Sequence, residues 1–338
     1  MWAFGRRQAY LPCSAAAAAL VSWGGCEGWR LRSSTSAASG TAQRFVRCEA
    51  SPHAPNLSVG CYNVLCSTYA VKWNEREGIG PDGASNWAAR WPAMRDVMQK
   101  AQFDVVTLQE VEHTDVDEIN AGLGTGYVSH YFKHAKRPPD GVLISLRKDA
   151  CQAVSHGEVQ WNNSVAFGRV DFVHKSSGRK VRVVTAHMRG GKKEQLKELV
   201  DFADDGNEAD VTVITADFNE DFGLSNGEFS CPFPDGPLGS WTTLQRDSSL
   251  PAVSRPPHKQ GPDQKSGKGK IDWIFVRGKA GSCDISLFHD QASRTAMLES
   301  HAPCAATGQW ASDHGCEALS IRIPSKMRRR TIFGLFWS

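Results

Sequence analysis

The stretch Val211-Thr-Val-Ile-Thr-Ala-Asp-Phe-Asn219 joins an apolar, β-branched run to an acid and an amide. A short continuous run of this kind predicts a buried strand over Val211–Ala216, and the acid and the amide then stand where the strand ends. Val181–Ala186 is a second such run, and His187 follows it directly. This pattern indicates a layered α/β fold whose polar residues gather at the ends of strands.

The rest of the body shows the same alternation of strands and helices. Lys192–Ala203 places its apolar residues on one helical face, and the residues around Pro92 predict a helix that begins near the proline. Lys175–Lys180 is typical of a β-hairpin turn, and Gly223–Lys270 is predicted to be mostly loop. Further strands are predicted at Leu57–Asn63, Asp104–Leu108, Val142–Leu146, Val165–His174, Ile271–Val276 and Cys316–Ile323. Strands outnumber helices, which favours a mixed α/β sandwich in one domain over a purely parallel, doubly wound sheet.

The composition is that of an ordinary globular protein. The chain has 338 residues, of which 41% are hydrophobic and 22% charged. This excludes a disordered chain, a collagen-like fibre and a polytopic membrane protein, and no apolar run reaches the roughly 18 residues that a membrane-spanning helix needs. The formal net charge is +3, but basic residues concentrate in residues 1–56 and 324–338, so the body between them is acidic. An acidic body does not suit a protein that coats nucleic acid through phosphate contacts alone, so a phosphate substrate needs a local basic site or a metal ion.

The two basic ends flank the predicted catalytic domain, residues 57–323. Residues 1–56 are rich in Arg, Ala and Ser and poor in acids, which predicts a mitochondrial or plastid transit peptide; a secretory signal and a plain tail on a cytoplasmic protein are the alternatives. Residues 324–338 form a basic and aromatic tail that we expect to fray or to pack on the body, with a membrane-surface or partner contact as the alternative. The ten cysteines show no C-x-x-C spacing, which argues against structural zinc and favours a reducing compartment. Cys61 and Cys316 lie in apolar runs and are predicted to be buried thiols.

Polar side chains recur at the ends of the predicted strands. They are Asn63, Gln109 with Glu110, His187, Asp217 with Asn219, Asp272, and Asp313 with His314. Each has a plainer interpretation when taken alone, as a strand terminator, a turn residue or a hydrogen-bonded core histidine. Strand ends in layered α/β folds meet at one edge, so their joint placement favours one cleft.

The motifs around these residues resemble, in order, those of the endonuclease/exonuclease/phosphatase superfamily. The motifs are Tyr-Asn-Val-Leu at 62–65, Leu-Gln-Glu-Val at 108–111, Thr-Ala-His at 185–187, Ala-Asp-Phe-Asn at 216–219, Ile-Asp-Trp-Ile at 271–274 and Ser-Asp-His at 312–314. The resemblance spans about residues 57–323 and implies a four-layer α/β sandwich, with two packed mixed β-sheets flanked by helices, in a single catalytic domain.

Four further segments resemble the nocturnin and deadenylase subfamily. These are Leu-Gln-Glu-Val-Glu-His at 108–113, Pro-Pro-Asp-Gly-Val at 138–142, Asn-Ser-Val-Ala at 163–166 and Trp-Thr-Thr at 241–243. The chain lacks the leucine-rich repeats of some deadenylases, which favours a nocturnin-like protein. It departs from the subfamily at Met188, where Leu is common, and at Arg189-Gly-Gly191, which leaves the choice of substrate open.

The resemblance implies a Mg²⁺-dependent hydrolase of phosphate esters, with Mn²⁺ as an alternative cation. Glu110 would be the main metal ligand with Asn63 beside it, and Asp313 would help to arrange the water around the metal. Mg²⁺ prefers such carboxylate and water oxygens, and it neutralises phosphate charge.

The resemblance also assigns the catalytic groups. Asp217 would orient and deprotonate the attacking water, and Asn219 would hold that water or a phosphate oxygen. His187 and His314 would donate hydrogen bonds to the phosphate, and Asp272 would keep His314 protonated.

Substrate recognition is predicted from basic and aromatic residues near these motifs. Asn163 is expected to contact the phosphate or sugar. Lys265, Lys268 and Lys270, together with Arg189 and Lys192, could bind a second phosphate, and a solvated loop is an equal alternative. Trp241, Phe218 and Trp273 are candidates for stacking on a base, although core packing is favoured for Trp273.

Three functions follow from these features. We expect removal of the 2′-phosphate of NADP(H); the alternatives are a 3′ exoribonuclease that removes poly(A) and a non-catalytic adaptor with a nuclease-like fold. The acidic body favours the small molecule over the RNA 3′ end, and the intact acids and imidazoles argue against the adaptor. The oligomeric state is left open.

Overall fold

The computed structural model describes residues 56–71, 87–135, 139–162, 164–190, 192–206, 208–220, 222, 224–225, 228–229, 240–244, 249–251, 270–280, 285–302 and 311–326. The chain divides into two units, Met1–Arg47 and Cys48–Ser338, and every described residue belongs to the second. The predicted transit segment up to residue 55, and the tail from residue 327, lie outside the described residues.

The first sheet is mixed and six-stranded. Its order is β12 (Ser286–Phe288), β13 (Glu317–Arg322), β1 (Asn56–Asn63), β2 (Val105–Glu112), β4 (Asp140–Arg147) and β3 (Tyr127–Lys133). Only β1 and β2 run parallel among these neighbours, and the other pairs are antiparallel. β2 and β4 are buried on both faces along nearly their whole length, as strands in the middle of a covered sheet are.

The second sheet is mixed and five-stranded. Its order is β11 (Asp272–Gly278), β8 (Val211–Asp217), β7 (Arg179–His187), β6 (Val165–His174) and β5 (Cys151–Trp161). β7 and β8 are parallel and the other pairs antiparallel, and β6 and β7 form the predicted hairpin. A separate two-stranded ribbon joins β9 (Leu224–Ser225) to β10 (Glu228–Phe229).

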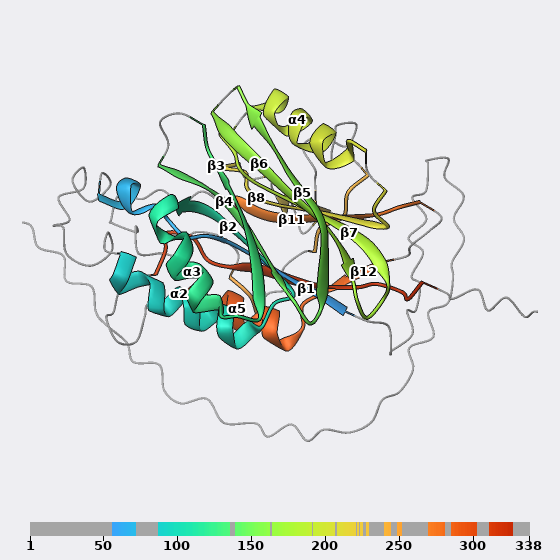
Figure 1. Ribbon diagram of the computed structural model, residues 1–338, viewed down its shortest axis with the longest axis horizontal. Helices are drawn as coiled ribbons and strands as arrows, with labels where there is room; N and C mark the ends of the chain where they lie inside the picture. The colour runs from blue at the N-terminus through green and yellow to red at the C-terminus, as the bar shows by residue number, and fades with distance from the viewer. Residues whose placement is uncertain are drawn as a thin grey trace, which may run out of the picture. The chain divides into compact units, whose positions relative to one another are not determined.

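Helices cover the outer faces of the two sheets (Figure 1). α2 (Trp87–Ala101), α3 (Val116–Leu123) and α5 (Gln291–Ser300) pack on the first sheet, and α4 (Lys193–Asp204) packs on the second. The 3-10 turn η1 (His113–Asp115) precedes α3, and residues 67–71 form a further short helix. The predicted apolar face of α4 is buried through Leu196, Leu199, Val200 and Ala203.

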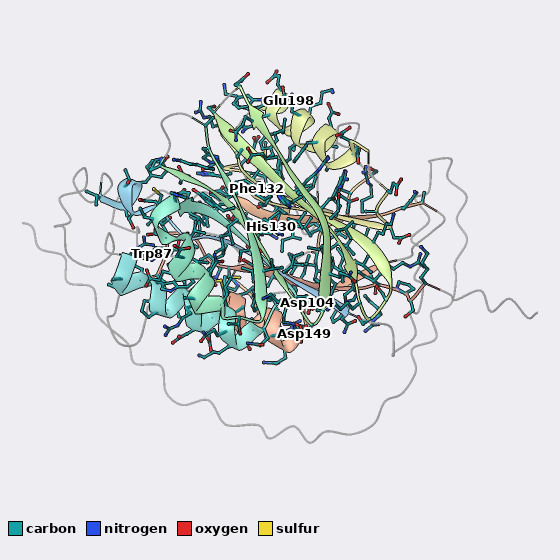
Figure 2. All side chains as sticks on the ribbon, viewed as in Figure 1. Trp87, Asp104, His130, Phe132, Asp149 and Glu198 are labelled. Atoms are coloured by element: carbon teal, nitrogen blue, oxygen red, sulfur yellow. The ribbon has the colours of Figure 1, made fainter. Side chains whose placement is uncertain are left out.

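Three apolar layers hold these elements together. One lies between the sheets, where Val59 of β1 and Val213 of β8 belong to the same cluster. Side chains fill this space, including the labelled Phe132 of β3 (Figure 2). A second layer joins Met94 of α2 to the first sheet, and a third joins Leu199 of α4 to the second. The predicted four-layer α/β sandwich is confirmed.

Some elements differ from their predicted form. α2 begins at Trp87, so Pro92 lies inside the helix rather than near its start. Proline lacks an N–H and weakens a helix interior, but the burial of Trp91 and Met94 beside it offsets that cost. β3, β5, α3 and α5 were not predicted. For β5 the reason is that it is an edge strand whose side chains are mostly exposed and polar, so its sequence shows no apolar run. Within the described part of the chain, no helix is long and apolar enough to cross a bilayer.

Candidate active site

Strand pairing brings the predicted polar residues to one end of the sandwich. In the first sheet, the parallel register pairs Asn63 of β1 with Gln109 of β2. In the second sheet, His187 of β7 pairs with Asp217 of β8, and Asp217 pairs in turn with Asp272 of β11. These registers put the ends of both parallel pairs at a common edge, as expected from the sequence.

Asn63 joins the two sheets through its side-chain amide. Its Nδ2 donates to Oε1 of Glu110 and to Oδ2 of Asp217, both at 2.9 Å. Its Oδ1 accepts a hydrogen bond from the backbone N–H of Leu65, also at 2.9 Å. The nitrogen of the amide, rather than its oxygen, therefore faces the carboxylates, and Asn63 acts as a donor between two acids.

The sequence suggested that Glu110 follows the strand, but Glu110 lies inside β2. The pairing of β2 with β4 shifts register between Leu108 and Val111, which is the signature of a β-bulge. Glu110 has φ 58, a left-handed conformation that costs energy for a residue with a side chain. The bulge re-aims its carboxylate, whose Oε2 accepts from the backbone N–H of Cys66 at 3.0 Å. Backbone strain is thus stored at an acid of the candidate site.

His314 lies between two carboxylates. Its Nδ1 lies 2.8 Å from Oδ2 of Asp272, and its Nε2 lies 3.6 Å from Oδ2 of Asp217. Burial opposes the charged ring, but Asp272, Asp217 and Asp313 outweigh it and raise the pKa of His314 to about 10. Oδ1 of Asp313 lies 3.8 Å from the same Nε2. The ring is therefore an imidazolium at neutral pH.

Asp217 and Asn219 form a tight turn beneath His187. The backbone N–H of Asn219 donates to Oδ1 of Asp217 at 2.8 Å, and its Nδ2 donates to the carbonyl of Met188 at 3.0 Å. The same Nδ2 lies 3.0 Å from Nε2 of His187. Burial raises the pKa of Asp217, while His314 opposes the rise. A carboxylate with a raised pKa is suited to accept a proton.

His187 faces three acids. Its Nε2 lies 3.7 Å from Oε1 of Glu110 and 3.7 Å from Oδ2 of Asp217. Burial disfavours its charge, but Glu110, Asp217 and Asp140 prevail and raise the pKa of His187. His187, Glu110 and Asp217 offer ligand atoms within 4.8 Å of one another, as a metal site requires.

A buried group behind His187 was missed by the sequence interpretation. Asp140 accepts a hydrogen bond from the hydroxyl of Tyr69 at 2.9 Å, and its Oδ2 lies 3.7 Å from Nε2 of His134. Burial raises the pKa of Asp140 to about 6 and lowers that of His134 to about 3. Nδ1 of His134 accepts from the backbone N–H of Ala166, so the neutral ring carries its proton on the nitrogen that faces Asp140. The only signal in the sequence was the Pro-Pro-Asp-Gly segment that contains Asp140.

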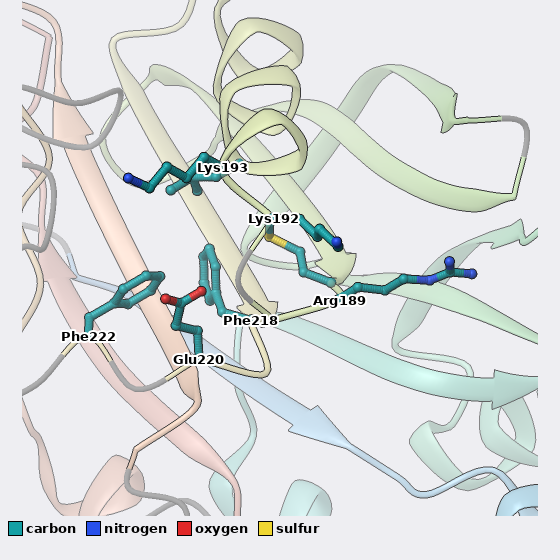
Figure 3. Close-up of a pocket in the computed structure, with 8 residues that line it drawn as sticks. Arg189, Lys192, Lys193, Phe218, Glu220 and Phe222 are labelled. Carbon is teal, nitrogen blue, oxygen red and sulfur yellow. The ribbon is translucent and has the colours of Figure 1, made fainter.

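The residues predicted to bind substrate do not gather in one place as the acids and imidazoles do. Arg189 and Lys192 are exposed and line a small pocket with Phe218 and Glu220. Their side chains point to the same side, away from Glu220 (Figure 3). Asn163, Lys265 and Lys268 lie outside the described residues.

Lys270 and Trp241 are buried, unlike the exposed substrate contacts that the sequence suggested. Nζ of Lys270 lies 3.4 Å from Oε2 of Glu317 and 4.3 Å from the ring centroid of Trp273. Trp241 is only 5% exposed and belongs to the apolar layer under α4, with the guanidinium of Arg277 over its ring. Each ring is engaged in packing, which was favoured from the sequence only for Trp273.

Comparison with known proteins agrees with this geometry. The model of the endonuclease/exonuclease/phosphatase family matches residues 61–314, which include every polar cluster described above. The chain belongs to this family. The resemblance seen in the motifs is thereby confirmed, and it places the chain in a family of hydrolases that act on ester bonds.

Solved structures share the fold at low sequence identity. ANGEL2, described as a 2′,3′-cyclic phosphatase, superposes in its complex with adenosine-2′,3′-vanadate with a TM-score of 0.56 and 17% identity over 79% of this chain and 96% of that chain. D. rerio TDP2 with a single-stranded DNA product gives 0.56 and 15%, covering 79% and 98%. The human nocturnin catalytic domain with a bound sulfate gives 0.54 and 14%, covering 80% and 95%.

One curated relative matches over a short segment. CCR4-NOT transcription complex subunit 6-like-A of Xenopus laevis is 39% identical over 57 residues. The matched segment covers 17% of this chain and 10% of that protein.

Proposed function

We propose that the protein is a Mg²⁺-dependent phosphoester hydrolase that removes the 2′-phosphate of NADP(H). The observation that carries the proposal is the bridge made by Asn63, whose amide donates to Glu110 and Asp217 at once. The bridge holds two acids together, and His187 and His314 flank them. Paired acids beside two imidazoles are what water attack on a phosphate ester requires.

The residues present fit a hard divalent cation. Two carboxylate oxygens, Oε1 of Glu110 and Oδ2 of Asp217, converge on the same amide nitrogen, and Nε2 of His187 lies 3.7 Å from each of them. Such an oxygen-rich donor set suits Mg²⁺, which keeps several waters and takes one or two carboxylates. Glu110 would hold the ion, with Asn63 orienting its carboxylate. When bound, the cation supplies positive charge to the phosphate oxygens.

The proton of the attacking water goes to the carboxylate of Asp217. Its raised pKa suits this acceptance, and Asn219 fixes its orientation through the backbone N–H. Asn219 also holds its side-chain amide beside His187, at a position from which it can contact a phosphate oxygen.

His314 and His187 donate hydrogen bonds to the phosphate as negative charge develops on it. Asp272 holds the ring of His314 from the opposite nitrogen, which leaves Nε2 directed toward the site. Asp313 lies close enough to steady the same ring.

The preference for NADP(H) is supported by the basic residues that remain exposed. Arg189 follows the site histidine closely in sequence, and Lys192 lines the same pocket, so a second phosphate of a dinucleotide could pair with both. The nocturnin-like motifs of the sequence support the same substrate. Lys270 does not contribute, because Glu317 engages it.

A 3′ exoribonuclease is the second candidate. The segment 39% identical to a CCR4-NOT subunit supports it, since the sequence resemblance also included the deadenylases. The substrate would then be the 3′ end of an RNA, with its phosphodiester at the same acids.

A substrate panel tests the two functions. The purified protein is incubated with NADPH, NADP⁺ or a labelled oligo(A), in Mg²⁺, in Mn²⁺ and in chelator, and free phosphate and RNA length are measured. We expect phosphate from NADP(H) in Mg²⁺ and none in chelator, with Asp217→Asn as the inactive control. Shortening of oligo(A) without phosphate release would favour the exoribonuclease, and inactivity on both would favour the adaptor.

A further inference from the structure

Arg90 is a buried arginine of α2 that the sequence motifs did not single out. Its side chain is only 2% exposed, and its charge interacts with the carboxylates of Asp313 and Glu110. Its Nη1 donates to the carbonyl of Val64 at 2.7 Å and to the carbonyl of Ala311 at 2.9 Å. Its Nη2 donates to the carbonyl of Leu65 at 2.7 Å and lies 3.5 Å from Oγ of Ser67.

The two segments that Arg90 binds are the ones that carry site residues. Val64 and Leu65 directly follow Asn63, and Ala311 directly precedes the Ser312–His314 segment. These segments also meet each other, because Oγ of Ser312 donates to the carbonyl of Asn63 at 2.6 Å. One guanidinium therefore joins the loop that carries the bridging amide to the loop that carries the imidazolium.

The first of these loops needs such a tether. Leu65 has φ 56, a left-handed conformation that is unfavourable for a leucine. In that conformation its N–H reaches Oδ1 of Asn63, which turns the amide nitrogen toward Glu110 and Asp217. The carbonyl of the same Leu65 is held by Arg90. Loss of that bond frees the strained residue and, with it, the orientation of the Asn63 amide.

Arginine is suited to this task because its donors are fixed in one plane. The planar fork of the guanidinium reaches three carbonyls on two segments of the chain at once, whereas a lysine offers one compact ammonium. Carbonyls occupy both Nη groups, whereas the buried Nε has no hydrogen-bond partner among the described residues, so the buried charge depends on the two loops staying in place.

We infer that Arg90 is a positioning residue for the phosphoester hydrolysis, acting through Asn63 on one loop and His314 on the other. This inference rests on the proposed function. It predicts that the fork, and not merely the charge, is needed for turnover.

The test compares Arg90 with a matched arginine remote from the site. Arg182 of β7 is also buried and donates to the carbonyls of Ala203 and Asp205. It lies five residues before His187 along an extended strand, about 17 Å from the site end. The variants are Arg90→Lys, Arg90→Met and Arg182→Lys, each in the full chain, with activity normalised to the folded fraction.

Two readouts are measured. For Arg90→Lys we expect kcat to fall by about 100-fold with KM within a few-fold of wild type, because misplaced groups lose turnover rather than binding. Backbone amides at 64–68 and 311–314 should exchange with solvent about tenfold faster, while amides of α4 and β6 keep their rates. Arg182→Lys should lower thermal stability and leave kcat and these loop amides unchanged.

Equal loss of kcat in Arg182→Lys and Arg90→Lys would overturn the inference, since both would then act through stability alone. Unchanged exchange at the two loops in Arg90→Lys would overturn it as well. If Arg90→Met does not fold, Arg90→Lys alone decides. If the wild type acts on neither NADP(H) nor oligo(A), the proposed function fails, and the exchange rates still decide whether Arg90 holds the loops.

Discussion

Nδ1 of His314 lies 2.8 Å from Oδ2 of Asp272, although the two residues are 42 positions apart in the chain. Both side chains are buried, and the other ring nitrogen faces Asp217. The imidazolium therefore sits between one carboxylate that orients it and another that we propose as the base. This pair fixes which face of the ring can reach a substrate.

Asp272→Asn should lower kcat by about 100-fold to 1,000-fold, the usual cost of losing an oriented donor to a developing oxyanion. The amide retains a hydrogen bond to the ring but no longer favours its charge. Phosphate release under saturating substrate measures the effect, with Asp201→Asn, whose side chain is 60% exposed, as a surface control. A variant that kept wild-type kcat would remove Asp272 from the mechanism.

Stability should fall as the pH rises from neutral to alkaline values in chelator. The pKa of His314 is raised to about 10, above the ordinary imidazole value of 6.5, so the folded state keeps a proton that the unfolded chain has lost. The stabilisation is therefore complete below about pH 6.5 and is lost as the pH approaches about 10. Urea unfolding at a series of pH values measures the slope.

Asp272→Asn supplies the control for that slope. Without the main charge that raises the pKa of His314, the decline should still begin near the ordinary imidazole pKa, but it should end at lower pH and be smaller in total. Identical slopes for the wild type and this variant would show that another group titrates in the alkaline range.

Much of the candidate site is predictable because strand ends are visible in sequence. Asp217 and Asn219 follow an apolar run, and the parallel pairing of β7 with β8 then places His187 opposite Asp217 without further information. The four-layer arrangement is predictable for the same reason, since apolar runs and the amphipathic pattern of α4 determine which faces are buried.

Other features depend on contacts that no local pattern encodes. The β-bulge at Glu110 depends on pairing with β4, which begins 30 residues later, and Leu-Gln-Glu-Val alone does not reveal it. The fate of Lys270 depends on Glu317 of a different strand, so its charge suggested a solvent-facing role that the fold denies it. β5 went unpredicted because exposed edge strands lack apolar alternation.

Mg²⁺ should raise the thermal midpoint of the protein, and Glu110→Gln should abolish most of the increase. Binding to the folded state alone adds about 2.7 kcal/mol at a hundredfold excess over Kd. The wild-type site holds the carboxylates of Glu110 and Asp217 on one amide, so a cation relieves their repulsion. Differential scanning fluorimetry with and without Mg²⁺ measures the shift, and an equal shift in Glu110→Gln would place the ion elsewhere.

Asp140→Asn should lower kcat, because Asp140 is one of the three acids that raise the pKa of His187. Tyr69→Phe, which removes only the hydrogen bond to Asp140, should have a smaller effect in the same direction. We expect Asp140→Asn to add little in a His187→Ala background, since its influence passes through that ring. Additive losses in the double variant would assign Asp140 a separate, structural role.

Lys270→Met should destabilise the fold without changing KM. Removing one partner of a buried ion pair leaves the other charge uncompensated, at a cost of about 3–5 kcal/mol. Here the partner is Glu317, whose Oε2 lies 3.4 Å from the ammonium, so the double variant with Glu317→Met should recover most of the loss.

Arg189→Met should have the opposite effect to Lys270→Met. We expect it to raise the KM for NADPH about tenfold and to leave stability within about 0.5 kcal/mol of wild type, because the Arg189 side chain is exposed. Urea unfolding and steady-state kinetics on the same preparations separate the two effects, and a raised KM in Lys270→Met would return that lysine to the substrate site.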